Sequence, residues 1–153
     1  MNVDRVRKQL EIDEGVVYEI YNDHLGYPTF GIGHLVKKDD PEYGLMIGDG
    51  VSKERVQEAF EADFTVACSE CSVLYSSDWD QFPEEVQEIL VNMLFNLGRP
   101  RLSKFKKMNA ALKNRNWTTA AIEGRDSRWY RQVGYRAERL MTCLLYTSDA
   151  ADD

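Results

Sequence analysis

The sequence has no apolar run that approaches the ~18 residues a membrane helix needs. Its N-terminal stretch, MNVDRVRKQLEIDEG, is charged and lacks the apolar centre of a secretory signal peptide. We therefore expect a soluble, cytoplasmic protein that does not take a membrane as a partner. The 153 residues, of which 43% are hydrophobic, are enough for one globular domain with its own core.

Cysteine and histidine are scarce, with three cysteines and two histidines in the chain. An odd number of cysteines does not favour a disulfide framework. Cys68 and Cys71 form a C-x-x-C pair, but both lie on the apolar stripe of a predicted helix, and no second pair follows. We interpret them as small core side chains and expect neither a metal site nor a cofactor.

The charge is distributed unevenly, although the whole chain carries a formal net charge of −7. Residues 1–98 hold 7 basic and 20 acidic side chains, whereas residues 99–139 hold 12 basic and 3 acidic ones. A basic segment of this kind attracts polyanions, so nucleic acid and anionic cell wall both fit it. Uneven charge on a helical surface without any such partner is the remaining alternative.

The hydrophobic periodicity predicts a mainly helical α+β domain. Residues 3–13 have the period of a helix, and Gly15 stands where a helix C-cap is expected. Residues 16–36 combine strand-like alternation with turn signals, so we expect a small antiparallel sheet there. Residues 37–51 contain several glycines and are predicted to form a loop.

The rest of the chain is predicted to be helical, up to an unusual tail. The broad apolar stripe of residues 83–97 indicates a helix at the buried centre of the helical part. Residues 143–153 depart from the helical pattern and resemble translated adapter sequence, so we predict a non-native tail there. The other helices are expected at 53–74, 102–113, 117–124 and 128–141.

Two acidic residues near the predicted sheet have unlike surroundings, as the hydrolysis of a glycosidic bond requires. Glu14 comes at the end of the first helix and before two valines, where the helix dipole and an apolar flank both favour the protonated acid. Asp23 lies in a polar turn, where ionisation is easy. Alone, this pair is a weak signal, because most acidic residues are surface charges.

A longer motif surrounds this pair and continues in two further blocks. The first block is Asp13-Glu14-Gly15, Tyr21, Asp23, Gly26-Tyr27, Thr29 and Gly31-Ile32-Gly33-His34-Leu35. The others are Asn92-Met93-Leu94-Phe95-Asn96-Leu97-Gly98 and then Trp117, Ser127-Arg128-Trp129-Tyr130, Gln132 and Arg136-Ala137. In order and spacing, these blocks resemble the phage-type lysozymes (glycoside hydrolase family 24), which include muramidases and endolysins. The resemblance covers residues 3–142, and its first block is the most specific.

The resemblance implies a fold and a catalytic set. Residues 1–142 would form a lysozyme domain with a cleft between a small β-containing lobe, at about 14–52, and a helical lobe, at about 53–142 plus the N-terminal helix. Glu14 would be the general acid and Asp23 its carboxylate partner, while Thr29 would hold the attacking water. For an inverting enzyme the two carboxyl groups should lie roughly 6.5–9.5 Å apart, against ~5–5.5 Å for a retaining one.

The resemblance also implies a set of substrate contacts and a supporting residue. His34 fits a buried hydrogen-bonding role rather than a catalytic one. The positions that match substrate-binding residues of the family are Gly33, Leu35, Phe95 and Arg136.

The implied function is hydrolysis of the β-1,4 bonds between N-acetylmuramic acid and N-acetylglucosamine in bacterial peptidoglycan. The enzyme would be a monomer that lyses bacteria and reaches the wall after release from the cytoplasm, with no nucleic-acid partner. One alternative is a lysozyme-like protein that binds the cell wall without cleaving it. A nucleic-acid binder, which rests only on the basic segment, is a weaker alternative. The presence of Glu14, Asp23 and Thr29 together favours the enzyme.

Overall fold

A computed structural model describes residues 1–148 of the chain and confirms the predicted α+β class, with many helices and one small antiparallel sheet. The contacts divide the chain into two compact units. We call residues 2–66 the N-terminal unit and the chain from Ala67 onward the C-terminal unit. The predicted lobes at 14–52 and 53–142 stay a prediction, and residues 149–153 of the predicted tail lie outside the described residues.

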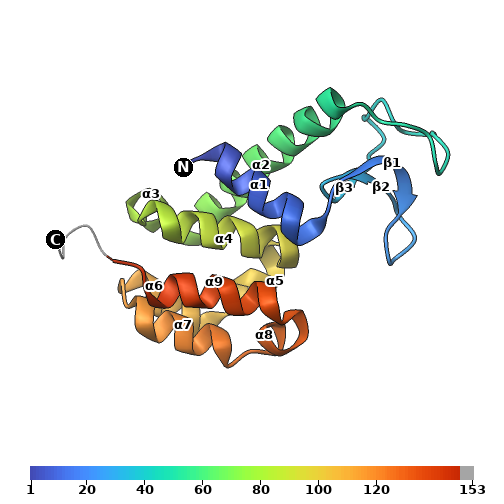
Figure 1. The fold of residues 1–153 in the computed structure, drawn as a ribbon. Coiled ribbons are helices and arrows are strands. Elements are labelled where there is room, and N and C mark those ends of the chain that lie inside the picture. Colours follow the sequence, from blue (N-terminus) through green and yellow to red (C-terminus); the bar gives the residue numbers. More distant parts are fainter. Residues whose placement is uncertain (149–153) are drawn as a thin grey trace. The chain divides into compact units, whose positions relative to one another are not determined.

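The N-terminal unit begins with helix α1 (Val3–Glu14), which starts where the Asn2 side chain accepts a hydrogen bond from the Arg5 backbone N–H at 3.0 Å. The helix ends at Gly15, as the sequence predicts, and the chain enters a three-stranded antiparallel sheet (Figure 1). Its strands are β1 (Val17–Asn22), β2 (Pro28–Gly31) and β3 (His34–Leu35), in that order across the sheet. The end of α1 is therefore joined to β1 by only two residues.

One face of the sheet packs against the first turns of helix α2 (Lys53–Tyr75). Phe30 of β2 points to this face and is fully buried, with the Arg55 guanidinium 5.6 Å from its ring centroid. Gly31 has a backbone φ of +65°, and a Cβ atom there would lie only 3.1 Å from Val56 Cγ1. Glycine is therefore needed at this point for the sheet to approach α2 closely.

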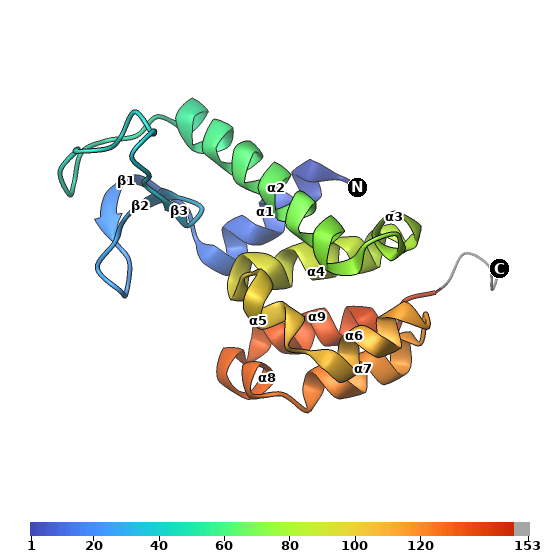
Figure 2. The ribbon, with the colours of Figure 1, turned by 180° about the vertical axis from the view of Figure 1, so that it is seen from behind.

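The C-terminal unit consists of helices. In the described residues, α7 (Trp117–Arg125) packs against α6 (Lys106–Lys113) and α9 (Tyr135–Leu145), as Figure 2 shows. Helix α9 also contacts α4 (Glu84–Leu97) and the short α8 (Arg128–Val133). The remaining short helices are α3 (Asp78–Gln81) and α5 (Arg99–Ser103).

The core of the C-terminal unit follows the predicted pattern. Helix α4 buries eight of its side chains, so the prediction of a buried central helix is confirmed. Cys71 is fully buried, and burial raises the pKa of its thiol to about 12, which makes it an unreactive core side chain. Cys68 is half-buried, and both cysteines are free thiols.

Several predicted helix boundaries were wrong. The helix expected at 102–113 is interrupted between α5 and α6, and the helix expected at 128–141 is two helices, because Gly134 adopts a φ of +76° between α8 and α9. Helix α3 was not predicted. Helix α9 continues to Leu145 and buries Leu144 completely, so part of the predicted tail is helical. Whether residues 143–153 are native stays a prediction.

Within residues 1–148, no helix is both long and apolar enough to pass through a bilayer. The same residues contain no group of three or more side chains that could hold a metal ion.

Candidate active site

The outer face of the sheet carries a row of side chains, one from each strand. The register pairs Tyr21 of β1 with Thr29 of β2, and Thr29 with Leu35 of β3. Directly paired residues of antiparallel strands point to the same face, so these three side chains lie side by side. Phe30 and His34 form the corresponding pair on the opposite face, towards α2. The sheet thus has one face that packs against α2 and an opposite face that carries Tyr21, Thr29 and Leu35.

Asp23 is held rigidly in the turn that follows β1. One carboxylate oxygen, Oδ1, accepts hydrogen bonds from the backbone N–H groups of Leu25 and Tyr27, both at 2.9 Å. The backbone closes the same turn, because the Asp23 N–H donates to the Tyr27 carbonyl and the Gly26 N–H donates to the Asp23 carbonyl. These bonds fix the orientation of the carboxylate. The second oxygen, Oδ2, accepts no hydrogen bond from the described residues.

Thr29 occupies the middle of the row and is 2% exposed. Its hydroxyl donates a hydrogen bond of 2.8 Å to the Tyr27 carbonyl. The hydroxyl hydrogen is thereby used, so this side chain can accept a hydrogen bond from a ligand but cannot donate one. The Tyr27 carbonyl also accepts from the Asp23 N–H, and the Tyr27 N–H donates to the Asp23 carboxylate, so Tyr27 ties the two predicted catalytic residues to one turn.

Glu14 is the last residue of α1, as predicted, and precedes the glycine that ends the helix. The predicted apolar flank was wrong, because the Glu14 side chain is exposed. Of the two valines that follow it, Val17 begins strand β1, where it pairs with Gly31.

Tyr21 connects the two acidic residues, and the sequence analysis gave it no role. Burial raises the pKa of its hydroxyl above the ordinary value of 10.0, and the negative charges of Glu14 and Asp23 raise it further. Both carboxyl groups are therefore close enough to one hydroxyl to act on it electrostatically. The hydroxyl stays protonated at neutral pH and remains a hydrogen-bond donor. The sequence offered one signal for this role: Tyr21 and Asp23 are two residues apart at the end of the predicted strand, and alternate residues of a strand share a face.

His34 is buried and hydrogen-bonded, as predicted. Its Nδ1 lies 2.7 Å from Asp63 Oδ2 of α2, and its Nε2 lies 2.9 Å from Asp40 Oδ2 of the following loop. Burial lowers the pKa of His34, but the hydrogen bonds and charges of Asp63 and Asp40 outweigh it, so the pKa is raised above 6.5. The imidazole ring thus fastens β3 to both α2 and the loop.

Arg55 of α2 extends the hydrogen-bond network of His34 on the face of the sheet that packs against α2. Its guanidinium binds the buried Glu42 through two parallel hydrogen bonds of 2.9 Å, and it also contacts Asp40 at 3.3 Å. Paired bonds of this kind fix orientation as well as position. The network was not predicted, because its members lie far apart in the sequence and charged residues usually face solvent.

The predicted substrate-binding residues fall into two groups. Gly33 and Leu35 lie in the N-terminal unit, and both are exposed; Leu35 belongs to the row on the sheet, and Gly33 comes just before β3. Phe95 and Arg136 lie in the C-terminal unit, on α4 and α9. There Arg136 donates from Nε to Asn92 Oδ1 at 2.8 Å and from Nη2 to the Asn92 carbonyl at 3.1 Å. Their contact with substrate stays a prediction.

Comparison with known proteins places this arrangement in a family. A model of the family described as phage lysozyme matches residues 11–142. The chain belongs to the phage lysozyme family. The match includes Glu14, Asp23 and Thr29 together with the whole sheet.

The curated relatives of this phage lysozyme family member come from a phage and a eukaryote. Two proteins of Dictyostelium discoideum, probable T4-type lysozymes 2 and 1, are 30% and 26% identical over 92% and 93% of this chain and 93% and 94% of their own lengths. The pre-baseplate central spike protein Gp5 of Enterobacteria phage T4 is 30% identical over 90% of this chain. The chain spans only 27% of that spike protein.

Proposed function

We propose that this protein is a lysozyme that lyses bacteria by hydrolysing the β-1,4 bond between N-acetylmuramic acid and N-acetylglucosamine in peptidoglycan. Membership of the phage lysozyme family supports a lysozyme-like function. The observation that carries the proposal is that Tyr27 holds both Asp23 and Thr29 by hydrogen bonds in one turn, within the family match that also contains Glu14. Two carboxyl groups gathered around one small region are what glycosidic hydrolysis needs. The enzyme acts as a monomer.

Glu14 is the general acid in this proposal. Its proton passes to the glycosidic oxygen as the bond from that oxygen to the anomeric carbon breaks. The exposed position lets a glycan approach the carboxyl group directly. Once a sugar covers the end of α1, water is excluded and the neutral acid is favoured, which supplies the apolar surroundings that the free protein lacks.

Asp23 and Thr29 hold the water that attacks the anomeric carbon. Both can only accept hydrogen bonds, Asp23 through its second oxygen Oδ2 and Thr29 through its hydroxyl oxygen. A water that donates one hydrogen to each directs its lone pair away from both, towards the sugar. As the new bond forms, Asp23 takes the proton. Attack from the face opposite the leaving oxygen inverts the anomeric configuration.

The sugar rings on either side of the bond need contacts of their own. Leu35 is 47% exposed and continues the row of Tyr21 and Thr29, so it offers an apolar surface beside the reacting bond. Gly33 lets the backbone approach a sugar closely. We assign the same task to Phe95 and Arg136 of the C-terminal unit by their match to the family motif.

Analysis of the products tests the proposed bond specificity. Purified peptidoglycan is digested with the enzyme, and the new reducing ends are converted to sugar alcohols. The product is then hydrolysed completely in acid so that its sugars can be identified. A muramidase yields the alcohol of N-acetylmuramic acid, and an inverting mechanism yields the α-anomer first in the NMR spectrum of a fresh digest. New N-acetylglucosamine ends, or binding to peptidoglycan without any new ends, would contradict the proposal. The second of these results would indicate a wall-binding protein without activity.

A further inference from the structure

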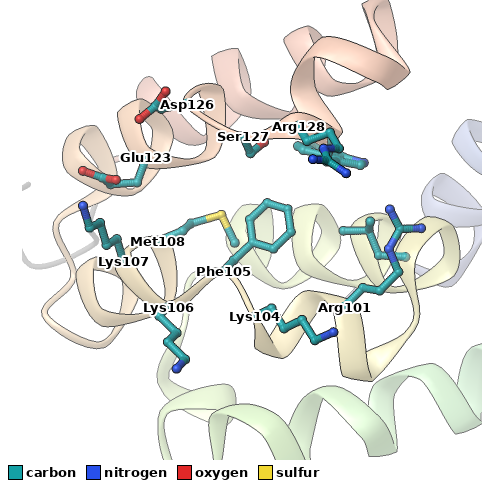
Figure 3. Close-up of a pocket in the computed structure, with 12 residues that line it drawn as sticks. Arg101, Lys104, Phe105, Lys106, Lys107, Met108, Glu123, Asp126, Ser127 and Arg128 are labelled. Carbon is teal, nitrogen blue, oxygen red and sulfur yellow. The ribbon is translucent and has the colours of Figure 1, made fainter.

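The C-terminal unit contains a pocket. It has a volume of about 540 Å³ and is formed by the segment of α5 and α6 on one side and the segment of α7 and α8 on the other (Figure 3). None of Glu14, Asp23 and Thr29 lines it. The proposed reaction therefore does not explain this pocket.

The floor of the pocket is apolar and fixed. The rings of Phe105 and Trp129 meet edge to face, with their centroids 5.9 Å apart. The Trp129 indole N–H donates to Asn96 Oδ1 at 2.7 Å, which holds its orientation. Met108 beside them is 1% exposed. Such a floor suits the neutral part of a ligand, for example a sugar or polyol.

The charges around this floor are separated. Figure 3 shows Arg101, Lys104 and Arg128 at one end of the pocket, with Glu123 and Lys107 at the other. The three cations are exposed, and within residues 1–148 their side chains make no ion pair and no hydrogen bond.

Arg115 of the same unit differs from these three cations because its charge is neutralised by an ion pair. It pairs with Asp78 at 3.0 Å and hydrogen-bonds Gln81, although it lies in the same basic segment. The pocket thus concentrates positive charge that the protein itself does not neutralise, which is typical of a site for an anionic partner.

We propose that this pocket binds a phosphodiester-linked anionic polymer of the bacterial wall, an inference that rests on the proposed action on walls. The guanidinium groups of Arg101 and Arg128 come from two different segments and can grip one phosphate by paired hydrogen bonds, with Lys104 as a further charge. The sugar or polyol unit next to that phosphate then covers Phe105. The cations account for the phosphate of the partner, and the apolar floor accounts for its neutral sugar or polyol unit.

A nucleic acid fits these features less well. Trp129 is buried and Phe105 is half-buried against it, so the pocket offers no stacking platform for successive bases. The closely spaced phosphates of a duplex would also meet the carboxylates of Glu123 and Asp126 at the far end. A polymer whose phosphates are separated by neutral units avoids this repulsion.

Binding to two preparations of the same wall tests the inference. One preparation keeps its phosphodiester polymer, and the other is stripped of it by acid extraction, leaving peptidoglycan. Cosedimentation at low salt is measured for the wild type, for R101Q/K104Q/R128Q, and for the control K8Q/K113Q/R131Q. The control removes three exposed basic residues that do not line the pocket, so both variants change the net charge equally.

We expect the wild type and the control to bind intact walls on the order of tenfold more tightly than stripped walls, since several charge-assisted contacts are lost with the polymer. The pocket variant should bind both preparations equally, while it hydrolyses stripped walls at the wild-type rate. Equal loss of binding to both preparations would overturn the inference in favour of a peptidoglycan contact. A stronger effect of the variant on binding to duplex DNA would overturn it in favour of nucleic acid.

Hydrolysis of stripped walls separates this inference from the proposed function. If the wild type binds the polymer through the pocket but releases no reducing ends from stripped walls, the lysozyme proposal fails and the polymer site stands. If it hydrolyses stripped walls but binds both preparations alike, the polymer site fails and the lysozyme proposal stands.

Discussion

Single residues of the candidate site differ mainly in how they are held. Asp23 is fixed by two backbone N–H groups of its own turn, whereas Glu14 is the exposed last residue of a helix. A fixed carboxylate suits the placement of a water, and an exposed one is accessible to a bulky glycan. Tyr21, opposite Thr29 in the sheet, is the residue whose hydroxyl senses both charges.

Removing the Tyr21 hydroxyl tests whether it contributes to the reaction. We expect Tyr21→Phe to lower kcat about tenfold, if the hydroxyl donates a hydrogen bond to a charged group during the reaction, because such a bond contributes about 1.5 kcal/mol or more. The unfolding free energy should change by less than about 1 kcal/mol, because the ring and its packing remain. Tyr18→Phe, in the exposed part of the same strand, is the control and should leave kcat unchanged. An equal effect of both variants would refute a specific role for Tyr21.

His34 provides a prediction of pH-dependent stability. Its pKa is raised above 6.5 in the folded protein, so the stabilisation is complete below pH 6.5 and is lost as the pH rises through the raised pKa. Despite burial, hydrogen bonds from Lys37 and His34 and the charges of His34 and Arg55 hold the pKa of Asp40 below 3.8, so its contribution is present above pH 3.8 and lost at lower pH.

The raised pKa of His34 and the lowered pKa of Asp40 together define the pH range in which the network stabilises the fold. His34→Asn should lower the unfolding free energy by about 1–3 kcal/mol near pH 5 and by less near pH 9. Urea unfolding at both pH values measures this, and His24→Asn, in the exposed turn, is the control. A loss for His34→Asn that is the same at both pH values would show that the charge of the imidazolium does not matter.

At the scale of elements, the approach of the sheet to α2 depends on Gly31. Gly31 and Gly33 have similar φ angles, +65° and +69°, but only Gly31 faces a neighbour, Val56. Gly31→Ala should therefore cost more unfolding free energy than Gly33→Ala, by about 1–2 kcal/mol, because both add backbone strain and only one adds a close contact. Thermal unfolding of the two variants measures the difference. Equal losses would mean that Val56 moves aside freely.

The elements were predictable where a local signal marks them. Helix α1 ends at Gly15, and the turn between β1 and β2 contains Asp23 and Gly26, so both followed from the sequence. The break between α8 and α9 was missed although Gly134 lies there, because a single glycine inside a helical pattern is often tolerated. Helix α3 was missed because its four residues are too few to show a period.

The site was likewise predictable only where a local sequence signal marks its residues. Glu14, Asp23 and Thr29 were found because they belong to one continuous motif that resembles a family. The partners of His34 were not, since Asp63 lies 29 residues away and is brought back only by packing. The role of Tyr21 depends on strand register, which a strand pattern alone does not specify.

On the scale of the whole molecule, the acidic and basic parts of the sequence fall largely into different units. The proposed catalytic carboxylates belong to the acidic N-terminal unit, and the unpaired cations of the pocket belong to the C-terminal unit. This distribution gives a protein with a net charge of −7 a local surface that can hold a negatively charged wall. Binding and cleavage should therefore be separable by mutation.

The most direct test of the central claim is the rate at which Glu14→Gln clears a suspension of permeabilised bacteria, compared with the wild type. Glutamine keeps the shape of the side chain but cannot donate the proton. We predict a loss of at least about 100-fold in lytic rate, with wall binding by cosedimentation and thermal stability unchanged. A Glu14→Gln variant that lyses bacteria within a few-fold of the wild-type rate would contradict the assignment of Glu14 as the general acid.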